Sequence, residues 1–111
     1  MSTTIELTTI KCNHTSELGS DEVYIKYSID NGREQRFPAN GWHSLSSGDT
    51  WDNVSLGLTF KDSVLIQLFD RDTFGDDSLG SHTYFPGDSQ PETVTVKNPN
   101  GADYSLSTIA K

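Results

Sequence analysis

Four aspartates lie within eight positions of one another in the segment 68–80, LFDRDTFGDDSLG: Asp70, Asp72, Asp76 and Asp77. An apolar, alternating run precedes them, so the carboxylates gather where a strand is expected to end. Carboxylates held in one loop repel one another by roughly 1 kcal/mol or more per pair. A hard divalent cation with oxygen ligands relieves this repulsion. The segment therefore predicts a calcium site.

The ligands of such a site must come from more than one loop, because calcium takes about six to eight oxygen atoms. Asp70 and Asp72 are two residues apart, so their carboxylates point to the same side of an extended chain. After a short turn, Asp76 or Asp77 can return to face them. Asp21, directly before another apolar run, is the best candidate from a second loop. Further candidate ligands are Glu17, Glu22 and the main-chain carbonyl of Arg71.

The elements that must position these carboxylates are strands, because apolar residues alternate with period two along the chain and helical spacing is absent. A change of phase near residues 8–9 indicates a bulge in the first strand. Asp30-Asn31-Gly32 indicates a tight turn, in which Asn31 and Gly32 tolerate positive φ. A long, turn-rich connection is expected over 38–49. We expect strands at residues 5–12, 23–29, 33–37, 54–60, 63–69, 81–85, 92–96 and 104–108.

Short strands without a helix are typical of a sandwich. The chain has 111 residues, which is enough for one modest core. We therefore predict a single domain, residues 1–111, folded as an all-β antiparallel β-sandwich of about eight strands.

Charge and composition narrow the classes of partner. The formal net charge is -8, from 16 acidic against 8 basic residues. A nucleic-acid binder needs a basic face for the phosphates, so we expect no nucleic-acid partner. The same charge disfavours an anionic membrane surface unless a metal reverses it locally. We expect a soluble, cytoplasmic chain, because residues 1–9 lack the features of a signal peptide and no stretch is long enough to span a membrane.

Three segments resemble the C2 domain family, the calcium-binding β-sandwiches of protein kinase C and synaptotagmin. Residues 20–26, SDEVYIK, are similar to its Ser-Asp-Pro-Tyr-Val-Lys segment, and residues 51–53 to its Asn-Pro-x-Trp-Asn-Glu corner. Residues 64–80 resemble its third calcium loop. The resemblance covers roughly residues 5–85 and implies a C2-like or jelly-roll-like sandwich. It also implies a set of calcium ligands: Asp21, Asp70, Asp72 and Asp77, with Asp76 as an alternate or second-site ligand.

The chain departs from the family's pattern at places that bear on its ligand. Thr15 stands about where the family has another aspartate, which leaves Glu17 as the nearest acid. Glu22 replaces a proline, and the third loop is one residue short. The family's lysine-rich lipid groove is missing, because its region holds only three basic residues: Lys26, Arg33 and Arg36. We therefore expect calcium binding rather than phospholipid binding.

Calcium-dependent phospholipid binding is the weaker extension of the resemblance. Phe74 and Leu79 lie in the acidic loop and would insert into a membrane once calcium has neutralised the carboxylates. We expect little of this binding, because a basic groove is missing.

Carbohydrate recognition is the rival function. Trp42 lies in a Gly-rich loop beside Asn40 and His43, and an exposed indole can stack on the apolar face of a sugar while amides bond its hydroxyls. In a lectin of this kind, calcium would shape the sugar-binding loop or bind the sugar directly. It would have to form a homodimer, since single sugar sites bind weakly. The alternative for each tryptophan is a place in the core, which we favour for Trp51.

The residue patterns do not indicate catalysis or zinc. The sequence contains no Gly-x-Ser-x-Gly elbow and no phosphate-binding glycine loop, so we expect a non-enzymatic protein. His14, His43 and His82 are scattered, and Cys12 is the single cysteine, so no zinc-binding spacing is seen. The plain alternative to a calcium site is a solvated acidic turn, because isolated Asp-rich loops often only cap turns.

Overall fold

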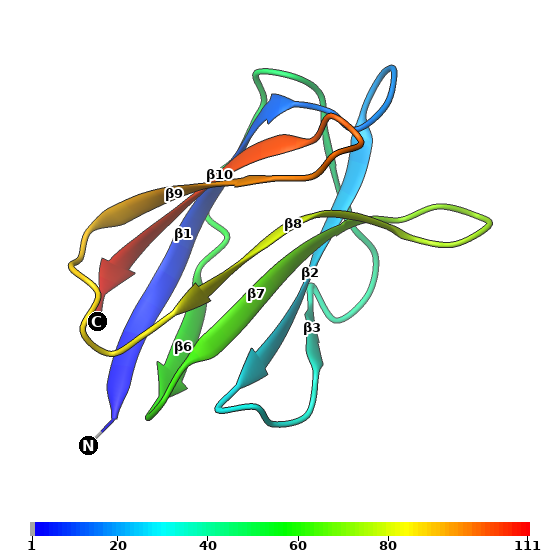
Figure 1. Cartoon of the computed structure of the whole chain (residues 1–111). Helices are drawn as coiled ribbons and strands as arrows, with labels where there is room; N and C mark the ends of the chain where they lie inside the picture. The colour runs from blue at the N-terminus through cyan, green and yellow to red at the C-terminus, as the bar shows by residue number, and fades with distance from the viewer. Residues whose placement is uncertain (1) are drawn as a thin grey trace.

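Alternating apolar residues fold into two antiparallel sheets (Figure 1). The computed structural model describes residues 2–111, which form ten strands and no helix. The predicted all-β antiparallel sandwich is therefore confirmed. Residues 2–111 contain no helix long and apolar enough to cross a membrane. The strands are β1 (Thr3–His14), β2 (Asp21–Ile29), β3 (Gln35–Phe37), β4 (His43–Leu45), β5 (Thr50–Trp51), β6 (Leu56–Phe60), β7 (Val64–Asp70), β8 (Asp77–Tyr84), β9 (Glu92–Lys97) and β10 (Asp103–Ala110).

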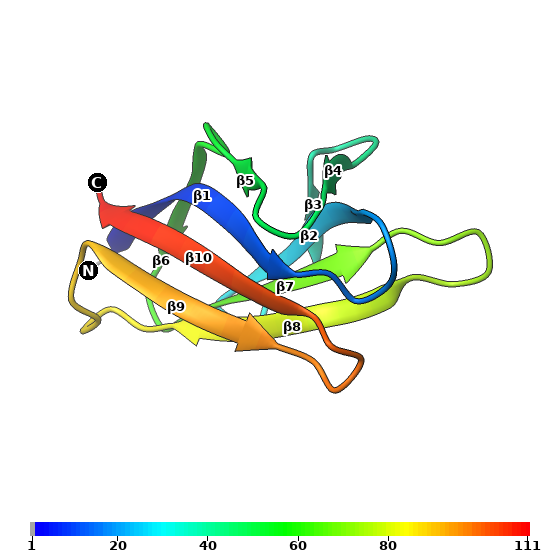
Figure 2. The same ribbon diagram turned by 90° about the horizontal axis from the view of Figure 1, so that it is seen from above.

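At one side of the sandwich, an edge strand of one sheet lies beside an edge strand of the other sheet. One sheet has the order β5-β1-β10-β9, with β6 also paired to β1. The other has the order β3-β2-β7-β8, with β4 also paired to β2. Figure 2 shows β8 and β9 running side by side, each at the edge of its own sheet. The β8–β9 connection therefore crosses from one sheet to the other.

The core lies between the inner faces of the sheets. In β7, Val64, Ile66 and Leu68 are buried, whereas the residues between them are partly exposed. This is the alternation that the sequence predicted. Trp51 is 8% exposed and packs in the core, as expected. The edge strands meet closely, because a Cβ at Gly80, which has φ +123°, would lie 3.0 Å from the Lys97 backbone.

Most strand ends lie within one or two residues of the prediction, whereas the two-residue strand β5, the strand β4 and the start of β8 were not predicted. The segment 38–49, expected to be a connection, contains the short strand β4, whose three residues are too few to show alternation. β8 begins at Asp77 rather than at residue 81, because its first residues pair with the end of β7. The bulge expected near residues 8–9 is confirmed by a register shift between Leu7 and Thr9.

The tight turn after β2 is present, but different residues adopt positive φ. Asp30 and Asn31 have φ values of 52° and 58°, whereas Gly32 does not adopt positive φ. The Gly32 N–H donates to the Ile29 carbonyl at 2.8 Å and closes the turn. Asp30 takes this conformation because its carboxylate accepts three backbone N–H groups of the neighbouring β6–β7 turn, at residues 61–63.

The strand directions place the acidic connections at one end of the molecule. β2 and β7 are antiparallel, so the first residue of β2 lies beside the last residue of β7. Figure 2 shows the β1–β2, β7–β8 and β9–β10 connections at this end. The β8–β9 connection lies at the opposite end, near the C-terminus.

Candidate metal centre

Asp21 and Asp70 are buried together at the end of the sandwich that carries the acidic loops. Asp21 is the first residue of β2 and Asp70 the last of β7, and the two residues are 0% and 1% exposed. Both belong to core-facing rows: Asp21 precedes the buried Val23 by two positions, and Val23 is paired with Asp70. Two rows of buried apolar side chains thus end in carboxylates.

Hydrogen bonds hold the Asp21 carboxylate in place. Its Oδ2 accepts the Ser16 N–H at 3.0 Å and the Tyr104 hydroxyl at 2.5 Å, while its Oδ1 accepts the Ser16 hydroxyl at 2.7 Å. Tyr104 lies on β10, so this carboxylate links the two sheets. Burial raises the pKa of Tyr104 far above its usual value, and the hydrogen bond to Asp21 raises it further, so the hydroxyl remains a donor.

Asp70 has fewer partners than Asp21. Its Oδ1 accepts the Glu22 N–H at 2.7 Å, and its Oδ2 lies 3.5 Å from the Ser16 hydroxyl. Burial raises the pKa of Asp70 to about 6; the charges of Asp21 and Glu17 add to the rise, and the Glu22 N–H opposes it. Within residues 2–111, no lysine or arginine forms an ion pair with Asp21 or Asp70. The pair therefore carries negative charge that no basic side chain balances.

Glu17 completes a trio of carboxylates with the buried pair. One carboxylate oxygen from each of Glu17, Asp21 and Asp70 lies within 4.8 Å of the other two. Glu17 is exposed in the β1–β2 connection, where its carbonyl accepts the Thr15 hydroxyl at 2.6 Å. An open depression of about 630 Å³ lies along this connection and is lined in part by Glu17. Of the trio, only Glu17 lines this depression, while Asp21 and Asp70 lie buried behind it.

The other three predicted aspartates lie outside the trio. Asp76 accepts the Tyr24 hydroxyl and, at 3.1 Å, the Asp72 N–H. The bond from Tyr24 holds the pKa of Asp76 below its usual value, and the Asp72 N–H lowers it further. Asp77 is paired with Asp70, so the two side chains leave the sheet on the same side. Asp72 and Asp77 are exposed. A ligand role for these three aspartates stays a prediction.

Glu22 and Arg71 form an exposed pair beside the site. The Glu22 Oε2 lies 3.9 Å from the Arg71 Nη1, and the Arg71 N–H donates to the Glu22 carbonyl at 2.8 Å. An ion pair this exposed contributes little to stability. The Glu22 carboxylate and the Arg71 carbonyl remain predicted ligands that no contact yet supports.

The candidate sugar-binding residues are exposed but do not form a common platform. Trp42 is 44% exposed, and the Arg71 guanidinium lies 4.5 Å from the centre of its ring. This contact takes one of the two ring faces on which a sugar would stack. His43 stacks instead on Trp51, with 4.8 Å between ring centroids, and Asn40 is exposed. Carbohydrate binding and a homodimer stay predictions without support.

Two residues that hold the site were missed by the sequence reasoning. Ser16 directly precedes Glu17, so a search of that loop for hydroxyl donors would have found it. Tyr104 comes from the far end of the chain, and nothing local marks it as a partner of Asp21.

The predicted insertion of Leu79 into a membrane is wrong, because this side chain is 0% exposed and packs in the core.

No protein-family model and no curated protein matches the sequence. The fold, however, is similar to solved C2 domains. A structure described as a C2 domain matches with a TM-score of 0.57 and 15% identity, over 100% of this chain and 98% of that chain. A structure of extended synaptotagmin 2 that holds two C2 domains matches with a TM-score of 0.63 and 16% identity, over 98% of this chain and 40% of that chain.

A third match is to human GIVD cytosolic phospholipase A2, in complex with a fluorophosphonate inhibitor and terbium chloride. Its TM-score is 0.58 at 12% identity, over 99% of this chain but only 17% of that chain. The present chain thus spans a small part of the phospholipase and nearly the whole of an isolated C2 domain. These matches confirm the fold that the sequence resemblance implied.

Proposed function

Because this chain has the fold of a C2 domain, we propose that it is a non-enzymatic calcium-binding module that holds the ion between the loops 16–22 and 70–77. The observation that carries the proposal is the pair Asp21 and Asp70, two buried carboxylates that no basic side chain of residues 2–111 neutralises. Buried carboxylates need a partner charge or a metal. A bound cation would supply that charge.

The donor atoms at this end fit a hard cation. Asp21, Asp70 and Glu17 offer carboxylate oxygens, and no nitrogen or sulfur ligand belongs to the trio. Calcium prefers such an all-oxygen set, whereas zinc prefers nitrogen and sulfur. Bound calcium would neutralise the acidic end of the sandwich. Asp72 and Asp77, both exposed on the β7–β8 hairpin, would supply further carboxylates to the ligand set.

Calcium should raise the melting temperature of the chelator-treated protein. An ion that binds only the folded state stabilises it by about 2.7 kcal/mol when its concentration is a hundredfold above Kd. Differential scanning calorimetry with calcium, and with magnesium as the matched ion, measures this effect. Magnesium should have the smaller effect, since it demands a more rigid octahedral ligand set. A melting temperature unchanged by millimolar calcium would contradict the proposal.

A second candidate function is calcium-dependent docking to phospholipid, and two exposed apolar side chains favour it. Leu18, in the β1–β2 connection, is 101% exposed, and Phe74, in the β7–β8 connection, is 97% exposed. They occupy the two loops that supply the acidic residues. Lys26 pairs with Glu34 at 3.5 Å and Arg36 covers the ring of Tyr24, so these bases offer no lipid groove. Docking would therefore depend on calcium and on the apolar tips.

The double substitution Leu18→Ala and Phe74→Ala should reduce calcium-dependent sedimentation with phosphatidylserine vesicles by about tenfold or more, because each side chain contributes about 1.5–3 kcal/mol when buried. The calcium-induced rise in melting temperature should not change. Phe85→Ala is the matched control, since Phe85 is 54% exposed and lies at the opposite end of the molecule. If the unsubstituted protein fails to sediment with calcium, docking is excluded while calcium binding is still open to test.

A further inference from the structure

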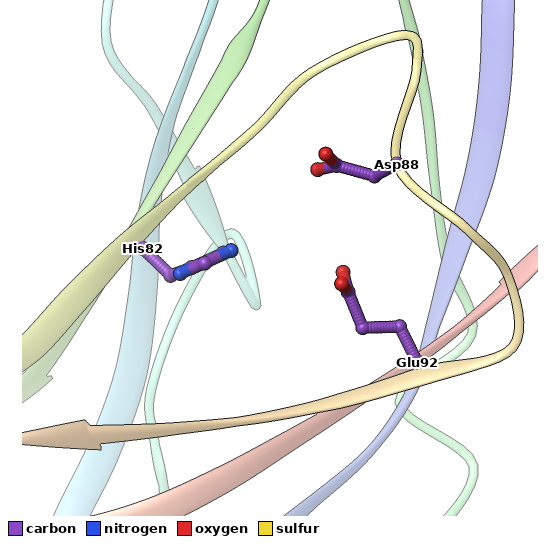
Figure 3. Close-up of side chains that lie close together, drawn as sticks. All are labelled: His82, Asp88 and Glu92. Carbon is purple, nitrogen blue, oxygen red and sulfur yellow. The ribbon is translucent and has the colours of Figure 1, made fainter.

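An imidazole and two carboxylates converge at the end of the sandwich opposite the acidic loops (Figure 3). His82 lies on β8, Asp88 in the β8–β9 connection, and Glu92 at the start of β9. One ligand atom of each residue lies within 4.8 Å of those of the other two. His82 is paired with the buried Ile66 and Glu92 with the buried Thr108, so both side chains face the interior of the sandwich.

Backbone contacts hold the third member of this cluster in position. The Asp88 Oδ2 accepts the Phe85 N–H at 2.9 Å, and the Asp88 N–H donates to the Phe85 carbonyl at 3.1 Å. Neither Asp88 nor Glu92 forms an ion pair with a lysine or arginine in the described range 2–111. Two partly buried carboxylates therefore face a histidine, and no lysine or arginine neutralises their negative charge.

Buried polar atoms around the cluster lack partners within the protein. Across residues 2–111, the buried side-chain atoms without a hydrogen-bond partner are all in this region: the Tyr84 hydroxyl, the Gln90 Nε2 and the Glu92 Oε1. Tyr84 is 1% exposed, and its ring meets that of His82 edge-on, with 4.6 Å between centroids. Leaving such groups unpaired costs about 1–3 kcal/mol each, so their concentration points to a ligand at this place.

The charges of the cluster also reach the buried tyrosine. The Tyr84 hydroxyl is buried, and the negative charges of Glu92 and Asp88 act on it. A cation held by the carboxylates would cancel those charges. The hydroxyl could donate a hydrogen bond to a carboxylate oxygen or to a metal-bound water, as groups around metal ligands commonly do.

One imidazole nitrogen and two carboxylate oxygens are a donor set that suits zinc rather than calcium. Calcium and magnesium favour sites made of oxygen alone, whereas imidazole suits zinc and neighbouring transition metals. Three protein ligands with an open fourth position are a known arrangement for zinc. Two carboxylates also balance the charge of a divalent ion, which makes a partly buried site electrically neutral.

We propose that His82, Asp88 and Glu92 bind a zinc ion that joins the two sheets at the β8–β9 crossing. The site is independent of the calcium site, since it lies at the opposite end and uses none of its residues. The spacing of the histidines in the sequence did not predict this zinc site. Asp88 and Glu92 come close to His82 only because the β8–β9 connection passes from one sheet to the other.

Zinc chloride titrated into chelator-treated, untagged protein should bind with one ion at this site in isothermal titration calorimetry. His82→Gln should weaken that binding by at least about tenfold, because it removes the nitrogen ligand. Glu92→Gln should weaken it as well, and it carries the test if His82→Gln does not fold by circular dichroism. His14→Gln is the matched control and should bind zinc as the unsubstituted protein does.

Asp70→Asn distinguishes the zinc site from the calcium site. This substitution removes a proposed calcium ligand and should leave the affinity for zinc unchanged. Calcium should not displace the zinc. The proposal is overturned if the unsubstituted protein shows no saturable zinc binding, or if folded His82→Gln and Glu92→Gln bind zinc with unchanged affinity.

Discussion

Replacing Asp70 with asparagine should remove the calcium-induced rise in melting temperature and, at the same time, raise the melting temperature of the metal-free protein. The asparagine keeps an oxygen that can accept the Glu22 N–H, now 2.7 Å from the Asp70 Oδ1. It removes a buried charge that has no basic partner. The calcium site loses a central ligand. The metal-free protein loses only the repulsion between Asp70 and Asp21 and the cost of burying the Asp70 charge.

The pH dependence of this substitution has a defined sign. The pKa of Asp70 is about 6 in the folded protein, from a usual value of 3.8, because burial disfavours the charged form. The folded state therefore binds the proton more tightly, and the stability of the metal-free protein falls as pH rises from about 4 to about 6. Each pKa unit corresponds to about 1.4 kcal/mol, so at pH 7 Asp70→Asn should be the more stable protein, by at most about 3 kcal/mol.

Urea denaturation of both proteins across this pH range, with a chelator present, measures the difference directly. The two curves should nearly coincide at the acidic limit and separate as the carboxyl ionises. Asp62→Asn is the control, because it makes the same charge change at an exposed position in the β6–β7 turn. If Asp70→Asn is less stable than the unsubstituted protein at pH 7, the buried charge of Asp70 does not destabilise the metal-free protein, and the prediction is wrong.

Replacing Asp21 with alanine should have the opposite effect on the metal-free protein and destabilise it by about 3 kcal/mol. This carboxylate accepts hydrogen bonds from the Tyr104 hydroxyl and from both the N–H and hydroxyl of Ser16. Tyr104 is 0% exposed, so its hydroxyl would be left buried without this acceptor. The penalty for such a group, together with the lost bonds to a charged acceptor, exceeds the relief of repulsion from Asp70.

The stabilities of Asp21→Ala, Asp21→Asn and Asp72→Ala, measured by urea denaturation, test this prediction. Asp21→Asn keeps an acceptor oxygen and should recover part of the loss. Asp72→Ala should change stability by no more than about 0.5 kcal/mol, because Asp72 is exposed and the single hydrogen bond to its carboxylate, from Phe74, is 3.4 Å long. An Asp21→Ala protein as stable as Asp72→Ala would show that Asp21 does not hold the two sheets together.

The sequence predicted the parts of this structure that depend on neighbours along the chain. Alternation in residues 64–68 predicted β7, and the position of Asp70 directly after that run placed a carboxylate at the end of a strand. The same reasoning placed Asp21 directly before the strand predicted at residues 23–29, and Asp21 is the first residue of β2. Because both strands bury one face, the carboxylates that continue their inner rows are also buried. This explains why the two central residues of the candidate site could be predicted.

The remaining features depend on tertiary contacts that spacing does not encode. Asp76 is next to Asp77 in the sequence, yet Tyr24 draws its carboxylate into a separate hydrogen bond. Tyr104 reaches Asp21 across 83 positions of the chain. Leu79 lies in an acidic segment and was expected to be exposed, but β8 begins two residues before it and turns it into the core. Sequence patterns predict which residues share a face, and the partners across sheets come only from the fold.

A calcium titration followed residue by residue in ¹⁵N–¹H spectra tests calcium binding most directly, because it reports both binding and its place. The amides of residues 15–22 and 69–77 should shift in a saturable way as calcium is added to chelator-treated protein. Those of His82, Asp88 and Glu92, at the other end, should stay where they are. Asp70→Asn should abolish the shifts. Spectra that do not change up to millimolar calcium, or that change only outside these two loops, would contradict the calcium site.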